Sequence, residues 1–264
     1  MDLELHDRCA LVTGGSRGIG RAAARQLARE GCDVVIAARD VAALKDAANE
    51  LSAETGRRVV PVGVDTAADA SVTDMVARAT AELGRIDILV NSAARSAGAS
   101  GPAATIPIGT LRDEIDIKAI GYLRCAQAVA PQMVERGWGR IISVAGLAAR
   151  QTGAVSAAVR NVAVAALTKS LADELGPRGV NVTAVHPGTT RTERIDAQLH
   201  RRAEAAGIDV SAAAAAMGSN YAIGRIVEPD EVGYVIAFLA SPRSIAISGD
   251  AIPCGGGRVG SIHY

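Results

Sequence analysis

The sequence predicts an α/β protein in which a doubly wound parallel sheet of about seven strands is covered by helices on both faces. Three observations support this fold class. Short apolar segments alternate with amphipathic ones, 49% of the residues are apolar but 2% are aromatic, and 28 of the 264 residues are glycine. Alternating strands and helices form parallel sheets through right-handed crossovers. Ligands of such sheets bind at the carboxyl ends of the strands.

Seven apolar segments have the length and composition of buried strands. They span residues 9–12, 34–38, 59–64, 86–90, 140–144, 180–185 and 250–253. Six longer segments carry apolar residues at helical spacing, namely residues 18–30, 41–54, 70–83, 111–136, 155–175 and 229–240. No repeat and no linker rich in proline, glycine or serine divides the chain, so we expect one domain over residues 1–264.

One segment departs from the alternation of strand and helix. Residues 189–224 are rich in alanine and show no strand pattern before the helix expected near Pro229. The alanine run at residues 212–216 is typical of a helix. Because long insertions at the ligand-binding edge often serve a binding function, we expect residues 189–224 to form a lid over the substrate.

Charge and cysteine content argue against several classes of function. The 28 basic residues balance the 28 acidic ones, so no overall charge attracts the chain to nucleic acid or to an anionic membrane. The four cysteines are far apart, and no group of residues has metal-ligand spacing. No apolar stretch reaches the roughly 18 residues of a membrane span, and the first ten residues do not resemble a signal peptide. We therefore expect a cytoplasmic protein without metal, membrane or nucleic-acid partner.

A glycine-rich loop follows the first strand. Residues 13–20, with the sequence TGGSRGIG, lead directly into the first helix. Gly14 allows a tight turn, Gly18 lets the backbone approach a pyrophosphate, and Gly20 lets helix and strand pack closely. The start of the helix supplies amide donors and a partial positive charge to the phosphates. In this βαβ context the loop predicts a Rossmann-type fold that binds a dinucleotide.

The end of the second strand indicates which dinucleotide is bound. An acidic residue at this position favours NAD, because it accepts a hydrogen bond from the free ribose hydroxyl. Here Arg39 stands at the strand end and Arg17 lies in the glycine loop nearby. Two guanidinium groups favour a 2′-phosphate. We expect NADP(H), with NAD(H) as the alternative in which Asp40 binds the ribose and both arginines are solvated.

With these motifs the chain resembles the short-chain dehydrogenases/reductases over nearly its whole length. The glycine loop matches the Thr-Gly-x-x-x-Gly-x-Gly signature, and residues 91–94 resemble the Asn-Asn-Ala-Gly turn in substituted form. Residues 187–192 look like the family's Pro-Gly-x-x-x-Thr segment, and residues 247–257 are similar to its closing strand. Asp65 matches the aspartate near the adenine. The motifs and the resemblance together place the cofactor on Gly14, Ser16, Arg17, Gly18, Ile19, Gly20, Arg39, Asp65, Asn91, Ala93, Pro187, Gly188, Thr189 and Thr192.

The resemblance fails at the catalytic residues. In the family, a tyrosine and a lysine lie four residues apart on one helix face, with a serine about thirteen residues upstream. The tyrosine passes a proton to the carbonyl oxygen while the lysine lowers the tyrosine pKa. Alignment on residues 167–172 puts Ala157 and Asn161 at these positions, whereas a count from Ser143 puts Ser156 and Arg160 there. Neither alignment restores the tyrosine.

The family's further asparagine falls on Lys118, which we expect to reach into the space that Asn161 leaves open. There Lys118 would bind the ribose or donate a proton, because burial lowers a lysine pKa toward neutrality. The alternative is a lysine whose stem packs at a helix interface. Ser143 either polarises the substrate carbonyl or caps backbone at a strand end. The candidate catalytic residues are therefore Ser143, Lys118 and Asn161.

We therefore expect an NADP(H)-dependent oxidoreductase that acts on a small-molecule carbonyl, alcohol or imine with a non-standard active site. The missing tyrosine and lysine leave two alternatives open. One is an NADP(H)-binding protein without redox turnover, such as a sensor or scaffold, and the other is a non-redox enzyme on the same fold. The resemblance implies a homodimer or homotetramer that assembles through residues 111–136 and 155–175.

Overall fold

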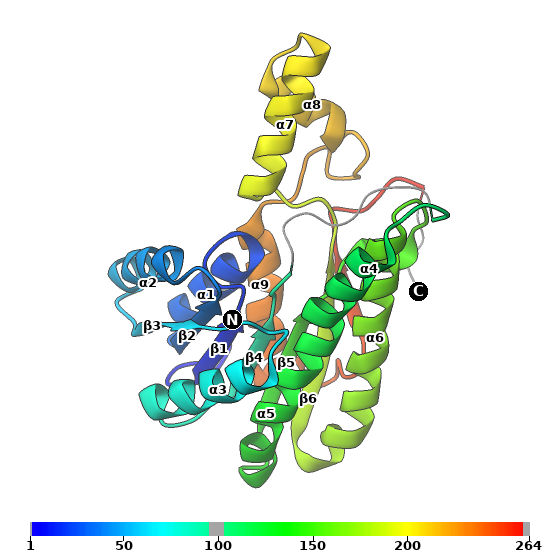
Figure 1. The fold of residues 1–264 in the computed structure, drawn as a ribbon. Helices are drawn as coiled ribbons and strands as arrows, with labels where there is room; N and C mark the ends of the chain where they lie inside the picture. Colours follow the sequence, from blue (N-terminus) through cyan, green and yellow to red (C-terminus); the bar gives the residue numbers. More distant parts are fainter. Residues whose placement is uncertain (1, 95–102, 261–264) are drawn as a thin grey trace.

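The computed structural model describes residues 2–94 and 103–260, and within them a seven-stranded parallel sheet forms the centre of the molecule (Figure 1). The strands are β1 (Cys9–Thr13), β2 (Asp33–Ala38), β3 (Val59–Gly63), β4 (Ile88–Asn91), β5 (Gly139–Val144), β6 (Val180–Pro187) and β7 (Ala251–Cys254). Their order is β3-β2-β1-β4-β5-β6-β7, with parallel pairing throughout. The connections change direction between β1 and β4, which opens a crevice at the carboxyl ends of these strands.

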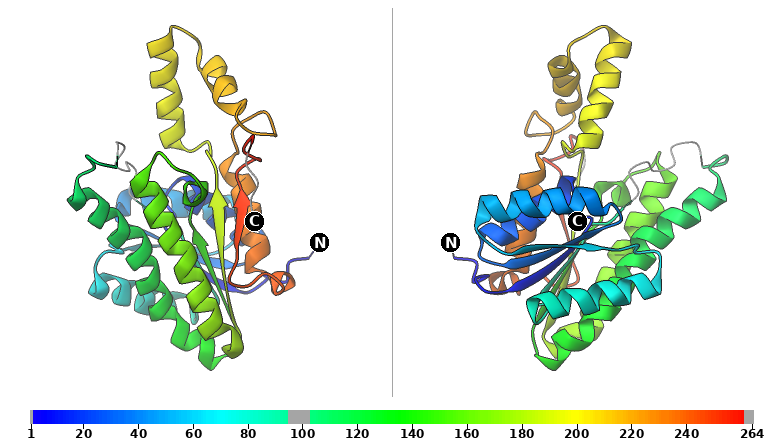
Figure 2. Two further views of the ribbon diagram at one scale, coloured as in Figure 1. Left: turned by 90° about the vertical axis from the view of Figure 1, so that its right-hand side faces the viewer. Right: turned by 60° about the vertical axis from the view of Figure 1, so that its left-hand side comes forward.

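Helices cover both faces of the sheet, as the sequence predicts (Figure 2). One face carries α1 (Gly18–Arg29), α2 (Val41–Thr55) and α9 (Pro229–Ala240); the other carries α3 (Asp69–Leu83), α5 (Gly121–Glu135) and α6 (Val155–Leu175). Successive strand residues serve opposite faces: Val12 packs with the first set of helices, and Leu11 packs with the second. The predicted fold class is confirmed.

The helix expected at residues 111–136 is interrupted. It consists of α4 (Ile108–Ile115), a π-helical turn at Asp116–Ile120, and α5. The π turn passes close to the loop after β3. A Cβ on Gly121 would lie 2.9 Å from the Thr66 carbonyl oxygen, and the Thr66 hydroxyl donates to the Ile117 carbonyl at 3.3 Å. Such turns are frequent at functional sites, and Lys118 lies at the centre of this one.

The segment expected to be a lid forms a helical arm that projects beyond the carboxyl ends of the strands (Figure 1). It contains α7 (Glu193–Ala206) and α8 (Val210–Gly218). The alanine run lies in α8, as its composition predicts, and Asp209 caps that helix by accepting from the Ala212 amide at 2.7 Å. The arm has a small core of its own, which includes Leu199 and Ala213.

The described residues also bear on membrane insertion and metal binding. Among the helices formed by residues 2–94 and 103–260, none is long and apolar enough to cross a membrane. In the same ranges, His, Cys, Asp and Glu side chains form no group of three or more that could hold a metal ion.

Candidate active site

A cavity of about 620 Å³ lies at the carboxyl ends of the strands. It brings together most of the residues that the sequence predicts for a dinucleotide. Those in its wall are Gly14, Ser16, Arg17, Ile19, Gly20, Arg39, Asp65, Ala93, Pro187, Gly188, Thr189 and Thr192. The cavity continues to the candidate catalytic residues Lys118 and Asn161, so both groups of side chains share one space.

The glycine loop leaves no room for larger residues. A Cβ on Gly20 would lie 2.2 Å from the Gly14 carbonyl oxygen, and one on Gly14 would lie 2.8 Å from the Ser92 backbone. Gly14 and Gly18 have φ of +70° and +56°, a backbone conformation that side chains disfavour. The loop therefore keeps its backbone open to the cavity, which is the geometry that a pyrophosphate requires.

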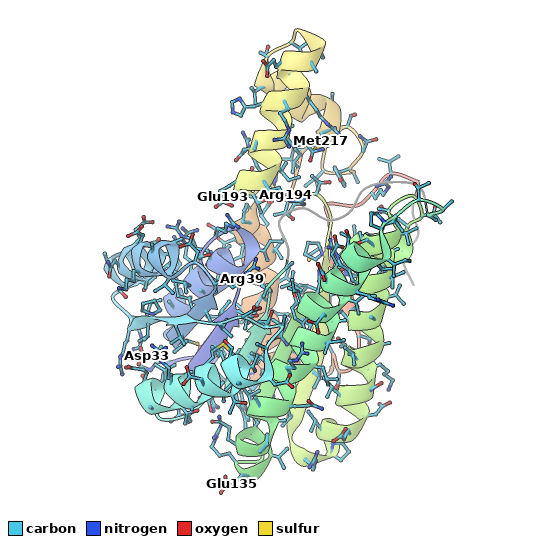
Figure 3. The ribbon with its side chains drawn as sticks, viewed as in Figure 1. Asp33, Arg39, Glu135, Glu193, Arg194 and Met217 are labelled. Carbon is cyan, nitrogen blue, oxygen red and sulfur yellow. The ribbon has the colours of Figure 1, made fainter. Side chains whose placement is uncertain are left out.

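The start of α1 behaves as an anion site. Arg17 occupies its N-cap position without a side-chain hydrogen bond to the helix, and the first turn contains no acidic residue. The Gly18 amide instead donates to the Glu193 carboxylate at 3.4 Å. Glu193 lies at the foot of α7, above Arg39 (Figure 3). The Gly18 amide already donates to an anionic group of the chain itself. The start of α1 therefore fits the phosphate of a dinucleotide. Gly18 borders a smaller neighbouring pocket.

The sequence predicts that side chains at the end of β2 select the dinucleotide. Arg39 and Asp40 both border the cavity. Asp40 caps α2, since its Oδ1 accepts from the Ala43 amide at 3.1 Å. This capping role accounts for an acidic residue here without a ribose contact.

Two predicted residues lie inside the sheet and not in the cavity wall. Asn91 is fully buried, and its Nδ2 donates to the Tyr122 carbonyl at 3.3 Å. Ser143 is paired with Asn91 and Ala184 in β5 and is 6% exposed. The cavity wall begins one residue later, with Val144, because β5 ends there and the chain turns along the cavity. Ser143 therefore does not line the cavity, and its contact with a substrate stays a prediction.

Lys118 borders the cavity and is buried, with 6% of its surface exposed. Its Nζ donates to the Ala145 carbonyl oxygen at 2.9 Å. Burial lowers the pKa of Lys118 from 10.5 to about 7, an effect increased by the positive charge of Arg160 and opposed by Glu114. A lysine with this pKa exchanges its proton near neutral pH. The expectation that Lys118 reaches the space beside Asn161 agrees with this placement.

The first turns of α6 distinguish between the two alignments of the catalytic helix. Ala157 and Asn161, the pair from the first alignment, both border the cavity. Of the second pair, Arg160 borders the cavity, but Ser156 is fully buried outside its wall and donates to Glu114. The Asn161 side chain is 4% exposed, and its Oδ1 has no hydrogen-bond partner in the described structure.

Sequence reasoning missed an ion pair beside Lys118. Glu114 of α4 and Arg160 of α6 are joined by a 2.7 Å contact, and their side chains are 0% and 15% exposed. No motif marks these residues, because they are 46 positions apart and meet only when the two helices pack. The signal available in the sequence was an acidic residue four positions before Lys118.

The foot of the arm also contributes residues that the sequence did not indicate. The Tyr221 hydroxyl donates to Thr189 Oγ1 at 2.6 Å, which ties the end of the arm to the Pro-Gly turn. Arg258 donates to the Gln151 side chain at 3.2 Å. All four side chains border the cavity. This part of the cavity wall is therefore built from segments that are far apart in the sequence.

Comparison with known proteins identifies the family. Residues 14–258 match a family model described as enoyl-(acyl carrier protein) reductase. The chain is similar to the short-chain reductase protein NovJ of Streptomyces niveus, with 36% identity over 94% of this chain and 93% of the relative.

Solved structures agree with this match. L-sorbose reductase from Gluconobacter frateurii, complexed with NADPH and L-sorbose, has a TM-score of 0.93 and 28% identity over 99% of this chain and 100% of that one. An NAD⁺-bound xylitol dehydrogenase has a TM-score of 0.87 and 26% identity over 96% and 100%. The predicted nicotinamide cofactor, NADP(H) with NAD(H) as the alternative, agrees with these two complexes. The chain therefore belongs to the short-chain dehydrogenases/reductases, a family of oxidoreductases.

Proposed function

We propose that this chain is an NADP(H)-dependent oxidoreductase that acts on a small carbonyl, alcohol or imine and uses Lys118 in place of the family's tyrosine. One observation carries the proposal: an amine with a pKa near neutrality is buried in the same cavity as the dinucleotide loop. Arg17 and Arg39 border the adenosine end and favour the 2′-phosphate of NADP(H). Asp65 and Ala93 border the same half of the cavity.

A bound nicotinamide dinucleotide supplies or accepts the hydride. In the direction of reduction, the Lys118 ammonium gives a proton to the carbonyl oxygen as that oxygen gains charge, and the amine that remains is the form favoured by burial. The Ala145 carbonyl holds the Nζ atom in place at 2.9 Å. In oxidation the neutral amine takes the hydroxyl proton. A protonated imine needs no such donor and is the substrate least affected by the missing tyrosine.

Asn161 is proposed as a binding residue for the nicotinamide ribose. Its amide replaces the family lysine on α6, and its buried Oδ1 has no hydrogen-bond partner among the described residues. A ribose hydroxyl would satisfy that acceptor. We leave Ser143 out of the proposed chemistry, because it does not border the cavity. The arm of α7 and α8 is proposed to cover the substrate, with Tyr221 and Thr189 joining it to the body.

The decisive experiment compares binding with turnover in Lys118→Ala. We expect NADPH affinity, measured by calorimetry, to change less than threefold. Oxidation of NADPH with the best substrate of a carbonyl and imine panel should fall by at least about a hundredfold, which is typical for loss of a general acid. Lys169→Ala is the control, because Lys169 is exposed and paired with Asp173. Full turnover by Lys118→Ala would refute the role of Lys118.

A second candidate function is NADP(H) binding without redox turnover, as in a sensor or scaffold. It is favoured by Ala157 and Asn161, which border the cavity at the family's tyrosine and lysine positions. This candidate predicts tight NADPH binding and no hydride transfer to any substrate. Deuteride transfer from labelled NADPH to a product, detected by mass spectrometry, would exclude it. Conversion of a substrate without any label transfer would indicate a non-redox enzyme instead.

A further inference from the structure

A buried ion pair lies next to the proposed proton donor. The Glu114 carboxylate is completely buried. It accepts hydrogen bonds from the Ser156 hydroxyl and the Arg160 guanidinium. Glu114 comes from α4 and its two partners come from α6, so the pair joins these helices beside the cavity. Buried ion pairs contribute little net stability, because the loss of hydration offsets the attraction between the charges. Stability alone therefore does not explain why two charges occupy this position.

The pair is placed to act on Lys118. Glu114 lies in the last turn of α4, and Lys118 follows four positions later in the π turn. Four positions are close to one helical turn, so both residues lie on the same side of this segment. Arg160 borders the cavity together with Lys118 and Asn161. One negative and one positive charge thus face the amine from two different helices. In a site shielded from water, neighbouring charges act strongly on one another.

We infer that the Glu114–Arg160 pair adjusts the charge state that burial imposes on Lys118, and that its two members are positioning residues of opposite effect. Glu114 favours the ammonium and Arg160 favours the neutral amine. The catalytic consequence rests on the proposed function, but the charge state of Lys118 does not depend on it.

The other ionisable groups around the π turn do not replace this control. Asp116, on the same turn, is paired with Arg124 of α5. Tyr122 of α5 stays neutral, because burial raises its pKa, and it donates to the Val144 carbonyl. Asp65, from the loop after β3, borders the same cavity, but the charges that shift the pKa of Lys118 are those of Arg160 and Glu114. The pKa of Lys118 responds to Arg160 and to Glu114 in opposite directions, in agreement with the geometry.

Lysine titration by NMR tests the inference without any assay of activity. The sequence contains three lysines, Lys45, Lys118 and Lys169, so selective ¹³C labelling of lysine gives few signals. The exposed Lys45 and Lys169 serve as internal controls. The variants are Glu114→Gln and Arg160→Gln, with Glu114→Asp as the variant that keeps the charge. The double variant Glu114→Gln/Arg160→Gln removes both charges and leaves two amides able to hydrogen bond.

We expect Glu114→Gln to lower the pKa of Lys118 and Arg160→Gln to raise it, each by about one unit, as for a neighbouring charge in a buried site. Glu114→Asp should titrate like the unmodified chain, and the double variant should fall between the two single variants. If one single variant fails to fold, the pKa of Lys118 is compared between the double variant and the other single variant. That difference has the sign expected for removal of the missing variant's charge.

Shifts in the same direction for both single variants, or no shift in either, would overturn the inference and indicate a structural pair. Failure of the proposed function is distinguishable, because it would leave these opposite shifts intact while NADPH turnover is absent.

Discussion

At the scale of single residues, the proposed chemistry depends on a lysine held in an environment that disfavours its charge. Lys118 could be proposed from the sequence, because its helix aligns with the corresponding helix of the family. In that alignment Lys118 takes the place of the family's asparagine. Glu114 and Arg160 could not, because their meeting depends on the packing of two helices that local patterns do not encode. Ser143 was chosen by its spacing from the catalytic helix, and in the structure it lies within β5 and does not line the cavity.

The depressed pKa of Lys118 predicts how stability depends on pH. The unfolded chain keeps this proton up to about pH 10.5, whereas the folded protein releases it at about pH 7. Between these values the unfolded state binds more protons, so the free energy of unfolding rises with pH. From pH 7 to pH 9 we expect the unmodified chain to gain about 2 kcal/mol relative to Lys118→Met, at 1.36 kcal/mol per unit. Urea unfolding measures the gain, and parallel curves for the two proteins would contradict it.

Arg39 carries a prediction about cofactor choice. A guanidinium bound to a phosphate contributes about 1.5–3 kcal/mol, so Arg39→Ala should weaken NADPH binding by roughly tenfold to a hundredfold and leave NADH binding unchanged. Calorimetry with both dinucleotides measures this difference. Arg243→Ala is the control, because Arg243 pairs with Glu4 near the chain start. Equal weakening of NADPH and NADH would indicate that Arg39 supports the loop and does not contact the phosphate.

At the scale of elements, the strands and most helices could be predicted because their signals are local. A buried parallel strand is an apolar run, and a surface helix has an apolar stripe. The π turn at Asp116–Ile120 could not be predicted, because the apolar spacing continues through it and its cause is the close approach of Gly121 to Thr66. The local signal of α7 could have been found as well, since its buried residues Ile195, Leu199 and Ala203 recur at every fourth position.

The separate core of the arm predicts that it opens independently of the body. Leu199 is fully buried in this core, so Leu199→Ala should destabilise the arm by about 2–4 kcal/mol. Hydrogen exchange should accelerate in α7 and α8 and remain unchanged in β1 and β4. Leu89→Ala, a substitution in the buried strand β4, should instead lower protection across the whole protein. If Leu199→Ala also lowered the protection of the sheet, the arm and the body would unfold as one unit.

At the scale of the whole molecule, the sheet order brings the predicted residues together. The loops after β1, β2, β4, β5 and β6 meet at one edge of a parallel sheet, so motifs spread over 180 positions share a single cavity. Most wall residues proposed to bind the cofactor were predictable from sequence, because each motif follows its own strand. Tyr221 and Arg258 were not, since they reach the cavity through the arm and the closing segment.

The outer face of α6 predicts a homo-oligomer. Val159 and Val162 are 42% and 50% exposed, and Ile120 of the adjoining π turn is 43% exposed. Residues three apart share a helix face, so these side chains form an apolar strip. Light scattering should give the mass of a dimer or tetramer. In a twofold interface each substitution occurs twice, so Val162→Lys places like charges together and should reduce the mass. Ile208→Lys, at the tip of the arm, should not change it. A monomeric unmodified chain at about 50 μM, within the range of typical cellular interactions, would refute the interface.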